Sequence, residues 1–174
     1  EKVFEVRSRT LPDEHPKLQD ARQNLAVTLA ALGDLAGARA LEEQVLEVRS
    51  RTLPDDHPDL QMARGNLAMR LNSLGDLAGA RALEEKVLEV NSRTLPDEHP
   101  DLQRARLNLA ATLYTLGDLA GARTLLEQVL EVNSRTLPDE HPDLQMARQN
   151  LAATLYSLGD LAGARALEEK LLEV

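Results

Sequence analysis

The sequence contains no cysteine, tryptophan or isoleucine, and aromatic residues make up 2% of its 174 residues. Without cysteine the chain has neither disulfides nor thiolate metal sites. Valine and the aromatic residues, which strands favour, are scarce, so a sheet-rich fold is disfavoured. No run of about 20 apolar residues is present, which excludes a membrane-spanning helix. The net charge of −9 disfavours binding to nucleic acid or to an anionic membrane.

Leucine and alanine are abundant, and the 35 Leu and 23 Ala together make up one third of the chain. Both favour helices, as do Glu, Arg and Gln. The hydrophobic share of 43% suits a folded protein. The predicted fold class is therefore all-α. The first residues lack the basic-then-apolar layout of a secretion signal, and we expect a cytoplasmic protein.

Two strings recur every 42 residues. R-T-L-P-D-[DE]-H-P begins at Arg9, Arg51, Arg93 and Arg135, and G-D-L-A-G-A-R begins at Gly33, Gly75, Gly117 and Gly159. We therefore predict a single solenoid over residues 1–174, with a partial second helix at 1–10 followed by units 11–52, 53–94, 95–136 and 137–174. Because the sequence starts and stops inside a unit, we expect a piece of a longer natural array or a designed consensus array.

Each unit holds two helical segments. In the second unit, a helix is predicted from Pro58 to about Leu74, with Leu and Ala recurring at spacings of three and four. Gly75 ends this helix and Asp76 caps the next, which runs from about Leu77 to Thr94. Over the chain this gives four first helices, starting near Pro16, Pro58, Pro100 and Pro142, and five second helices. One helix pair cannot bury its apolar face alone, so the pairs are expected to stack as an α-solenoid.

The helix pair, its Gly-Asp turn, the N-L-A string of the first helix and the small Ala80 early in the second resemble the tetratricopeptide repeat (TPR) family. The 42-residue period and the string L-P-D-E-H-P-D-L resemble its kinesin-light-chain subtype. The aromatic packing positions of the family are occupied by Arg64, Leu71, Leu77 and Glu84, which leaves a HEAT-like helical repeat array as the alternative fold. The resemblance implies a right-handed superhelix whose concave groove, lined by the first helices, binds peptides or partner proteins.

The face of each first helix opposite its leucine stripe carries few charges. We call these 24 positions the first-helix wall: Asp20, Gln23, Asn24, Val27, Ala30 and Ala31; Met62, Gly65, Asn66, Met69, Asn72 and Ser73; Arg104, Leu107, Asn108, Ala111, Tyr114 and Thr115; Met146, Gln149, Asn150, Ala153, Tyr156 and Ser157. Only Asp20 and Arg104 are charged, whereas 28% of the whole chain is. All three methionines and both tyrosines lie on the wall. Such a composition is typical of an adaptable binding surface, because an ordinary solvent-exposed face is rich in Lys and Glu.

We therefore predict a non-catalytic scaffold that binds a protein or peptide segment along this wall. The predicted groove residues are Gln23, Asn24, Val27, Met62, Asn66, Met69, Asn72, Arg104, Asn108, Tyr114, Met146, Gln149, Asn150 and Tyr156. The asparagines at 24, 66, 108 and 150 recur in every unit, and an amide side chain can bind a peptide group. The resemblance implies that these asparagines contact the bound chain. The alternatives are a structural amide bonded to a neighbouring helix and, for the whole wall, sequence drift or packing on another domain.

A structural spacer or self-assembling array is the alternative function. As part of a larger protein, the array would form a sensor or regulatory arm. We expect the apolar residues Val3, Phe4 and Leu11, and Leu167 and Leu171 at the other end, to be partly exposed. End-to-end self-association is therefore expected as well.

No pattern typical of catalysis or of cofactor binding is present, and we predict no catalytic residue, metal or cofactor. The histidines at 15, 57, 99 and 141 lie one unit apart, too far to share a metal ion, so a turn or capping role is expected. The arginines at 22, 64, 106 and 148 are expected to extend along the edge of the leucine stripe or to pair with a second-helix glutamate. The adjacent glutamates 42–43, 84–85 and 168–169 are expected to be surface charges.

Overall fold

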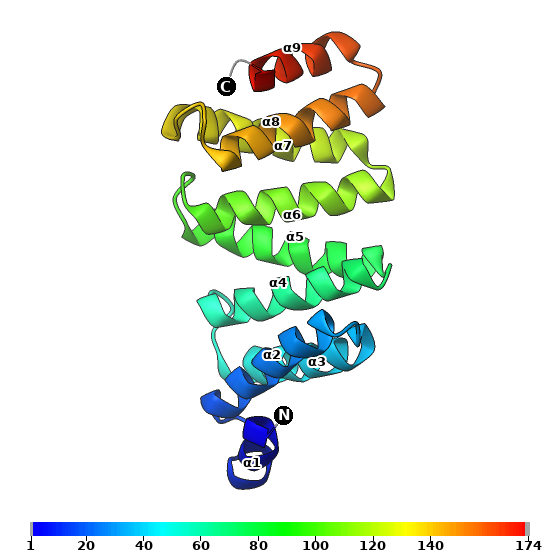
Figure 1. Cartoon of the computed structure of the whole chain (residues 1–174). Coiled ribbons are helices and arrows are strands. Elements are labelled where there is room, and N and C mark those ends of the chain that lie inside the picture. Colours follow the sequence, from blue (N-terminus) through cyan, green and yellow to red (C-terminus); the bar gives the residue numbers. More distant parts are fainter. Residues whose placement is uncertain (1, 173–174) are drawn as a thin grey trace. The chain divides into compact units, whose positions relative to one another are not determined.

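A computed structural model describes residues 2–172 of the chain, which form helices joined by short turns (Figure 1). The nine helices of this range are α1 (Lys2–Thr10), α2 (Pro16–Ala31), α3 (Leu35–Thr52), α4 (Pro58–Ser73), α5 (Leu77–Thr94), α6 (Pro100–Leu116), α7 (Leu119–Thr136), α8 (Pro142–Ser157) and α9 (Leu161–Leu172). The first helices begin at the four predicted prolines, and residues 2–172 contain no strand. The prediction of an all-α helical repeat fold is confirmed.

The chain divides into two compact units, Glu1–Val90 and Asn91–Val174. In the first unit α1 packs on α2, α2 on α3 and α3 on α4. A buried cluster joins α4 to α5 through Leu67, Leu71 and Ala80, with Leu46 of α3 and Leu83 of α5 packed against it. In the second unit α6 packs on α7, α7 on α8 and α8 on α9. Each unit thus buries its apolar faces between successive helices.

The leucine stripe of the first helices forms the core. Leu60, Leu102 and Leu144 occupy equivalent places in α4, α6 and α8 and are at most 2% exposed. Burial of each such side chain stabilises the fold by about 1.5–3 kcal/mol. The small residues Ala80 and Ala122, early in α5 and α7, are fully buried. Their small size lets the second helix approach its neighbours closely.

The Gly-Asp turn ends each first helix and begins the second. Gly117 has a φ of +84°, the left-handed conformation that glycine adopts without strain. The next N–H, that of Asp118, donates to the carbonyl of Leu113 at 2.9 Å. The carboxylate of Asp118 in turn accepts a hydrogen bond from the N–H of Gly121 at 3.0 Å and caps α7.

The His-Pro turn starts each first helix. Nδ1 of His99 accepts a hydrogen bond from the N–H of Asp101 at 3.1 Å, and His15, His57 and His141 make the equivalent contact. The predicted capping role of the histidines is therefore confirmed. Gln103 holds the turn from the helix side, because its Nε2 donates to the carbonyl of Asp97.

The arginines beside the leucine stripe pair with this turn. Arg106 lies 2.7 Å from the carboxylate of Asp97, and the same pair recurs as Arg22–Asp13, Arg64–Asp55 and Arg148–Asp139. The prediction of a second-helix glutamate as partner was wrong. The turn folds back over the start of its own first helix, which brings an aspartate nine residues earlier in the chain within reach of each arginine.

Two of the glutamates predicted to be surface charges are buried. Glu42 is 4% exposed and Glu84 is 5% exposed, whereas Glu43, Glu85, Glu168 and Glu169 are exposed. Arg70 Nη2 of α4 donates to Glu42 Oε1 of α3 at 3.3 Å, and Asn72 donates to Glu84 at 3.1 Å. The prediction was wrong for Glu42 and Glu84 because their polar partners lie on an adjacent helix, which the pattern within one helix cannot reveal.

The apolar residues considered for self-association have mixed exposure. Phe4, Leu11, Leu167 and Leu171 are partly exposed, as expected. The side chain of Val3 lies outside the described residues. Leu161 and Leu172 of α9 are more open, at 59% and 87% exposure.

Candidate functional site

The first-helix wall is open to solvent in both units. None of its 24 residues is buried. In the first unit they lie on α2 and α4, and in the second on α6 and α8. Met62, Met69 and Tyr156 are 50%, 55% and 67% exposed. Large apolar side chains on a solvent-facing helix surface offer contact area to a partner.

The two charged residues of the wall both lie close to an opposite charge. Arg104 Nη2 is 2.8 Å from the carboxylate of Asp101, and Asp20 is 3.8 Å from Arg49. The wall therefore presents little uncompensated charge, and what it offers a ligand is apolar area and neutral hydrogen-bonding groups.

The recurring asparagines present free amides. Asn24, Asn108 and Asn150 are exposed and Asn66 is partly exposed. Within residues 2–172 their side chains make no hydrogen bond, although the backbone carbonyls of Asn24 and Asn150 accept bonds from threonines one turn later. Asn72, by contrast, bonds Glu84.

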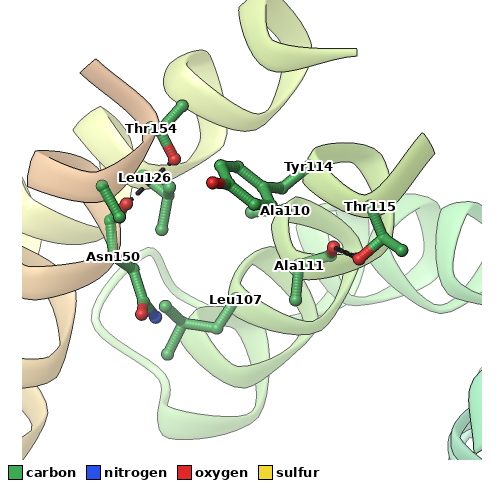
Figure 2. A pocket seen from close by; sticks show the side chains of 9 residues that line it. Leu107, Ala110, Ala111, Tyr114, Thr115, Leu126, Asn150 and Thr154 are labelled. Carbon is green, nitrogen blue, oxygen red and sulfur yellow. Dashed lines mark hydrogen bonds between the residues drawn. The ribbon is translucent and has the colours of Figure 1, made fainter. Parts of the chain in front are cut away.

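A pocket of about 260 Å³ opens on the wall of the second unit, between α6 and α8. Its lining consists of Leu107, Ala110, Ala111, Tyr114, Thr115, Leu126, Asn150, Ala153 and Thr154. Figure 2 shows the ring of Tyr114 extending from α6 towards Leu126 and Thr154, while Leu107 lies opposite the Asn150 amide. The lining contains no Asp, Glu, His, Lys or Arg.

Tyr114 is held in place by a hydrogen bond across the two first helices. Its hydroxyl lies 2.9 Å from Ser157 Oγ. Ser157 itself donates to the carbonyl of Ala153, so the tyrosine hydroxyl is the donor in the bond between them. This bond fixes the ring that forms one side of the pocket.

The floor of the pocket consists of Leu126, Ala110 and Thr154, and the pattern within the first helices does not predict it. Leu126 and Thr154 are 3% and 1% exposed and lie outside the wall. The sequence does contain an indication of this floor, because Leu126 occupies the position that holds Glu42, Glu84 and Glu168 in the other 42-residue repeats.

The equivalent place in the first unit has the opposite chemistry. Glu42 corresponds to Leu126 and Arg70 corresponds to Thr154, each 84 residues earlier. Burial raises the pKa of the Glu42 carboxyl, and this effect exceeds the lowering by Arg70. The same scaffold therefore carries a buried ion pair in one unit and an apolar floor in the other.

Two features are absent from the part of the chain that the structure describes. In residues 2–172 no three His, Asp or Glu side chains are placed to hold a metal ion. No helix of that range combines the length and the apolar character that crossing a membrane requires.

Two family models, both described as tetratricopeptide repeat, match the sequence. One covers residues 18–59 and 60–101, and the other covers residues 101–174. A search of curated proteins finds no significant match.

Solved structures give the same assignment. The nearly identical TPR-like repeats of a kinesin-light-chain-like protein from Podospora anserina are 30% identical, with a TM-score of 0.90 over 99% of this chain and 82% of that one. BtubC (BKLC) from P. vanneervenii is 20% identical, with a TM-score of 0.86 over 97% of this chain and 67% of that one. The MamA RS-1 double mutant is 17% identical, with a TM-score of 0.73 over 98% and 80%. At these lower identities BtubC and MamA share the fold alone.

These matches decide between the TPR and HEAT-like alternatives. The two matched spans 18–59 and 60–101 are each 42 residues long, in agreement with the 42-residue period of the chain. The chain belongs to the tetratricopeptide repeat family, whose arrays are protein-interaction scaffolds of a generally non-catalytic kind.

Proposed function

We propose that the chain binds an extended or helical segment of a partner protein along the first-helix wall, in the groove that the first helices line. The observation that carries the proposal is the combination of exposure and low charge, because all 24 wall positions are open to solvent and only two are charged. Met62, Met69, Met146, Tyr114 and Tyr156 supply apolar contact area.

The asparagine amides supply the polar part of the proposed interaction. An amide offers two donors and an acceptor, which match the carbonyl and N–H of a peptide group. Because Asn24, Asn66, Asn108 and Asn150 recur every 42 residues, each sequence repeat contributes one such group. A segment held through its backbone by asparagines and through its side chains by apolar residues needs no charge for recognition.

Selection of a binding peptide, followed by NMR mapping of the surface that it contacts, tests the proposal. Peptides are selected from a displayed random library against the whole chain, and the strongest binder is titrated into isotope-labelled protein. The expected result is that NMR signals shift on α2, α4, α6 and α8 and stay in place on the exposed faces of α3, α5 and α7. Shifts confined to the second helices would contradict the proposal.

Self-association is a second candidate, favoured by the exposure of Leu161 and Leu172 on α9. Copies of the chain would then stack through the apolar faces of α1 and α9, and the array would act as a spacer or self-assembling element. Sedimentation velocity over a wide concentration range tests this candidate. The average sedimentation coefficient is expected to rise with protein concentration. A strictly monomeric profile at high concentration would contradict this candidate.

A further inference from the structure

We propose that the pocket between α6 and α8 receives one bulky uncharged side chain, of the size of phenylalanine or leucine, from the bound segment. The inference rests on the proposed function and specifies the ligand that one place on the wall selects. It starts from the contrast between the Leu126–Thr154 floor of this pocket and the Glu42–Arg70 pair at the equivalent place in the first unit.

The size of the pocket suits one side chain. Its volume of about 260 Å³ is below the range of roughly 300–1,000 Å³ that drug-sized ligands occupy. It exceeds a cavity of about 150 Å³, which is large enough to bind benzene. A whole drug-sized ligand is therefore too large, whereas an aromatic ring or a branched aliphatic side chain fits.

The lining selects against charge. Leu107, Ala110, Ala111 and Leu126 make most of the surface apolar, and a buried charge without a partner is costly. The two threonine hydroxyls already donate to backbone carbonyls, Thr115 to Ala111 and Thr154 to Asn150. The remaining free polar group is the Asn150 amide, which can bind the backbone of the residue whose side chain enters the pocket.

The pocket is formed before any ligand binds. The hydrogen bond from Tyr114 to Ser157 fixes one side of it at 2.9 Å, and Leu126 and Thr154 belong to the buried core. Binding therefore orders few protein groups, which favours affinity.

Toluene and benzoate test the chemistry directly on the full chain. Both probes carry the same ring, but only benzoate is charged. Toluene is expected to shift the methyl NMR signals of Leu126 and Thr154, and benzoate at the same concentration to leave them unchanged. No shift with toluene, or equal shifts with the two probes, would overturn the inference.

Ala111→Met is the matched variant, because the chain already carries Met69 at the equivalent position of the first unit. The longer side chain fills the pocket, so the toluene shift is expected to disappear. Ala120→Met, on an exposed position of α7, is the control and is expected to keep the shift. Persistence of the shift in Ala111→Met would show that toluene binds elsewhere and would refute the assignment.

The selected peptide separates this inference from the proposed function. Ala111→Met is expected to weaken peptide binding by about tenfold or more, which corresponds to about 1.4 kcal/mol. If the peptide binds the wall with unchanged affinity in Ala111→Met, the pocket assignment fails and the proposed function stands. If no selected peptide maps to the wall, the proposed function itself fails.

Discussion

At the residue scale, the histidines of the four His-Pro pairs act as helix caps. Replacing His99 by Ala removes the acceptor of the Asp101 N–H, and we expect a loss of about 0.5–2 kcal/mol in the free energy of unfolding. His99→Asn retains a capping acceptor and should recover most of that loss. Urea denaturation of the two variants makes the comparison, and equal stability of His99→Ala and the parent chain would contradict the capping role.

Two glycines should respond in opposite ways to alanine. Gly65 lies in α4 with open space around it, so Gly65→Ala should stabilise the chain by about 0.5–1 kcal/mol. At Gly121 a Cβ would lie 2.9 Å from a carboxylate oxygen of Asp118. Gly121→Ala should therefore displace the α7 cap and cost about 0.5–2 kcal/mol. Thermal melts of the two variants and of the parent chain measure both changes. A higher melting temperature for Gly121→Ala than for the parent would show that the cap tolerates the methyl group.

The contacts that could be predicted at this scale are the local ones. Proline, histidine, glycine and aspartate fix helix ends through neighbours two to five residues away, so the sequence alone indicated the caps. The partner of Arg106 could not be predicted in the same way. The helical pattern places Arg106 on a face, but the proximity of Asp97 depends on how the preceding turn folds back.

At the element scale, the buried Glu42–Arg70 pair joins α3 to α4. Glu42→Leu would leave Arg70 buried without its partner, and we expect a loss of about 3–5 kcal/mol. The double variant Glu42→Leu/Arg70→Thr reproduces the Leu126–Thr154 arrangement of the second unit, and its stability should equal or exceed that of the parent by up to about 4 kcal/mol. Denaturant titrations of both variants test the pair. A double variant as unstable as the single one would contradict this account.

The same pair predicts a pH dependence. The pKa of Glu42 is raised above its ordinary value of 4.5, chiefly by burial. The folded chain therefore takes up this proton at a higher pH than the unfolded chain, and the Glu42 contribution to stability grows as the pH falls towards 4.5 and is lost as the pH rises through the raised pKa. Relative to Glu42→Gln, the parent chain should gain stability on acidification over that window. A parallel pH profile of the two proteins would contradict the raised pKa.

Helix boundaries at this scale followed from sequence, and inter-helix polar contacts did not. The spacing of leucines and the turn residues fixed the starts of α2, α4, α6 and α8. Glu42 and Glu84 were misassigned because a residue at the edge of a helical stripe is buried or exposed according to the neighbouring helix. The pocket floor at Leu126 could not be predicted for the same reason.

At the scale of the whole molecule, the low charge of the wall predicts how binding responds to salt. Arg104 and Asp20 each lie close to an opposite charge, so screening by added salt removes little attraction. The affinity for a wall-bound peptide should change little between low and high ionic strength. Isothermal titration at several salt concentrations measures this, and a steep loss of affinity with salt would point to a charged surface elsewhere.

The family and the repeat could be predicted at this scale because both depend on strings of identical residues that recur every 42 positions. The wall could also be located, since helical periodicity determines which face opposes the leucine stripe. Its pocket could not be found in this way. The pocket depends on small residues of α6 and α8 that face each other above Leu126 of α7, a juxtaposition of three helices.

The most direct test of the central claim is a titration of the selected peptide against Tyr114→Ala/Tyr156→Ala, with Gln128→Ala on an exposed position of α7 as control. Both tyrosines are exposed on the wall, at 41% and 67%. The double variant should lose about 1–3 kcal/mol of binding free energy for each aromatic anchor that the peptide covers, with little change in melting temperature, while the control binds normally. A double variant that melts early and binds the peptide with unchanged affinity would contradict the account, because the tyrosines would then serve packing and not recognition.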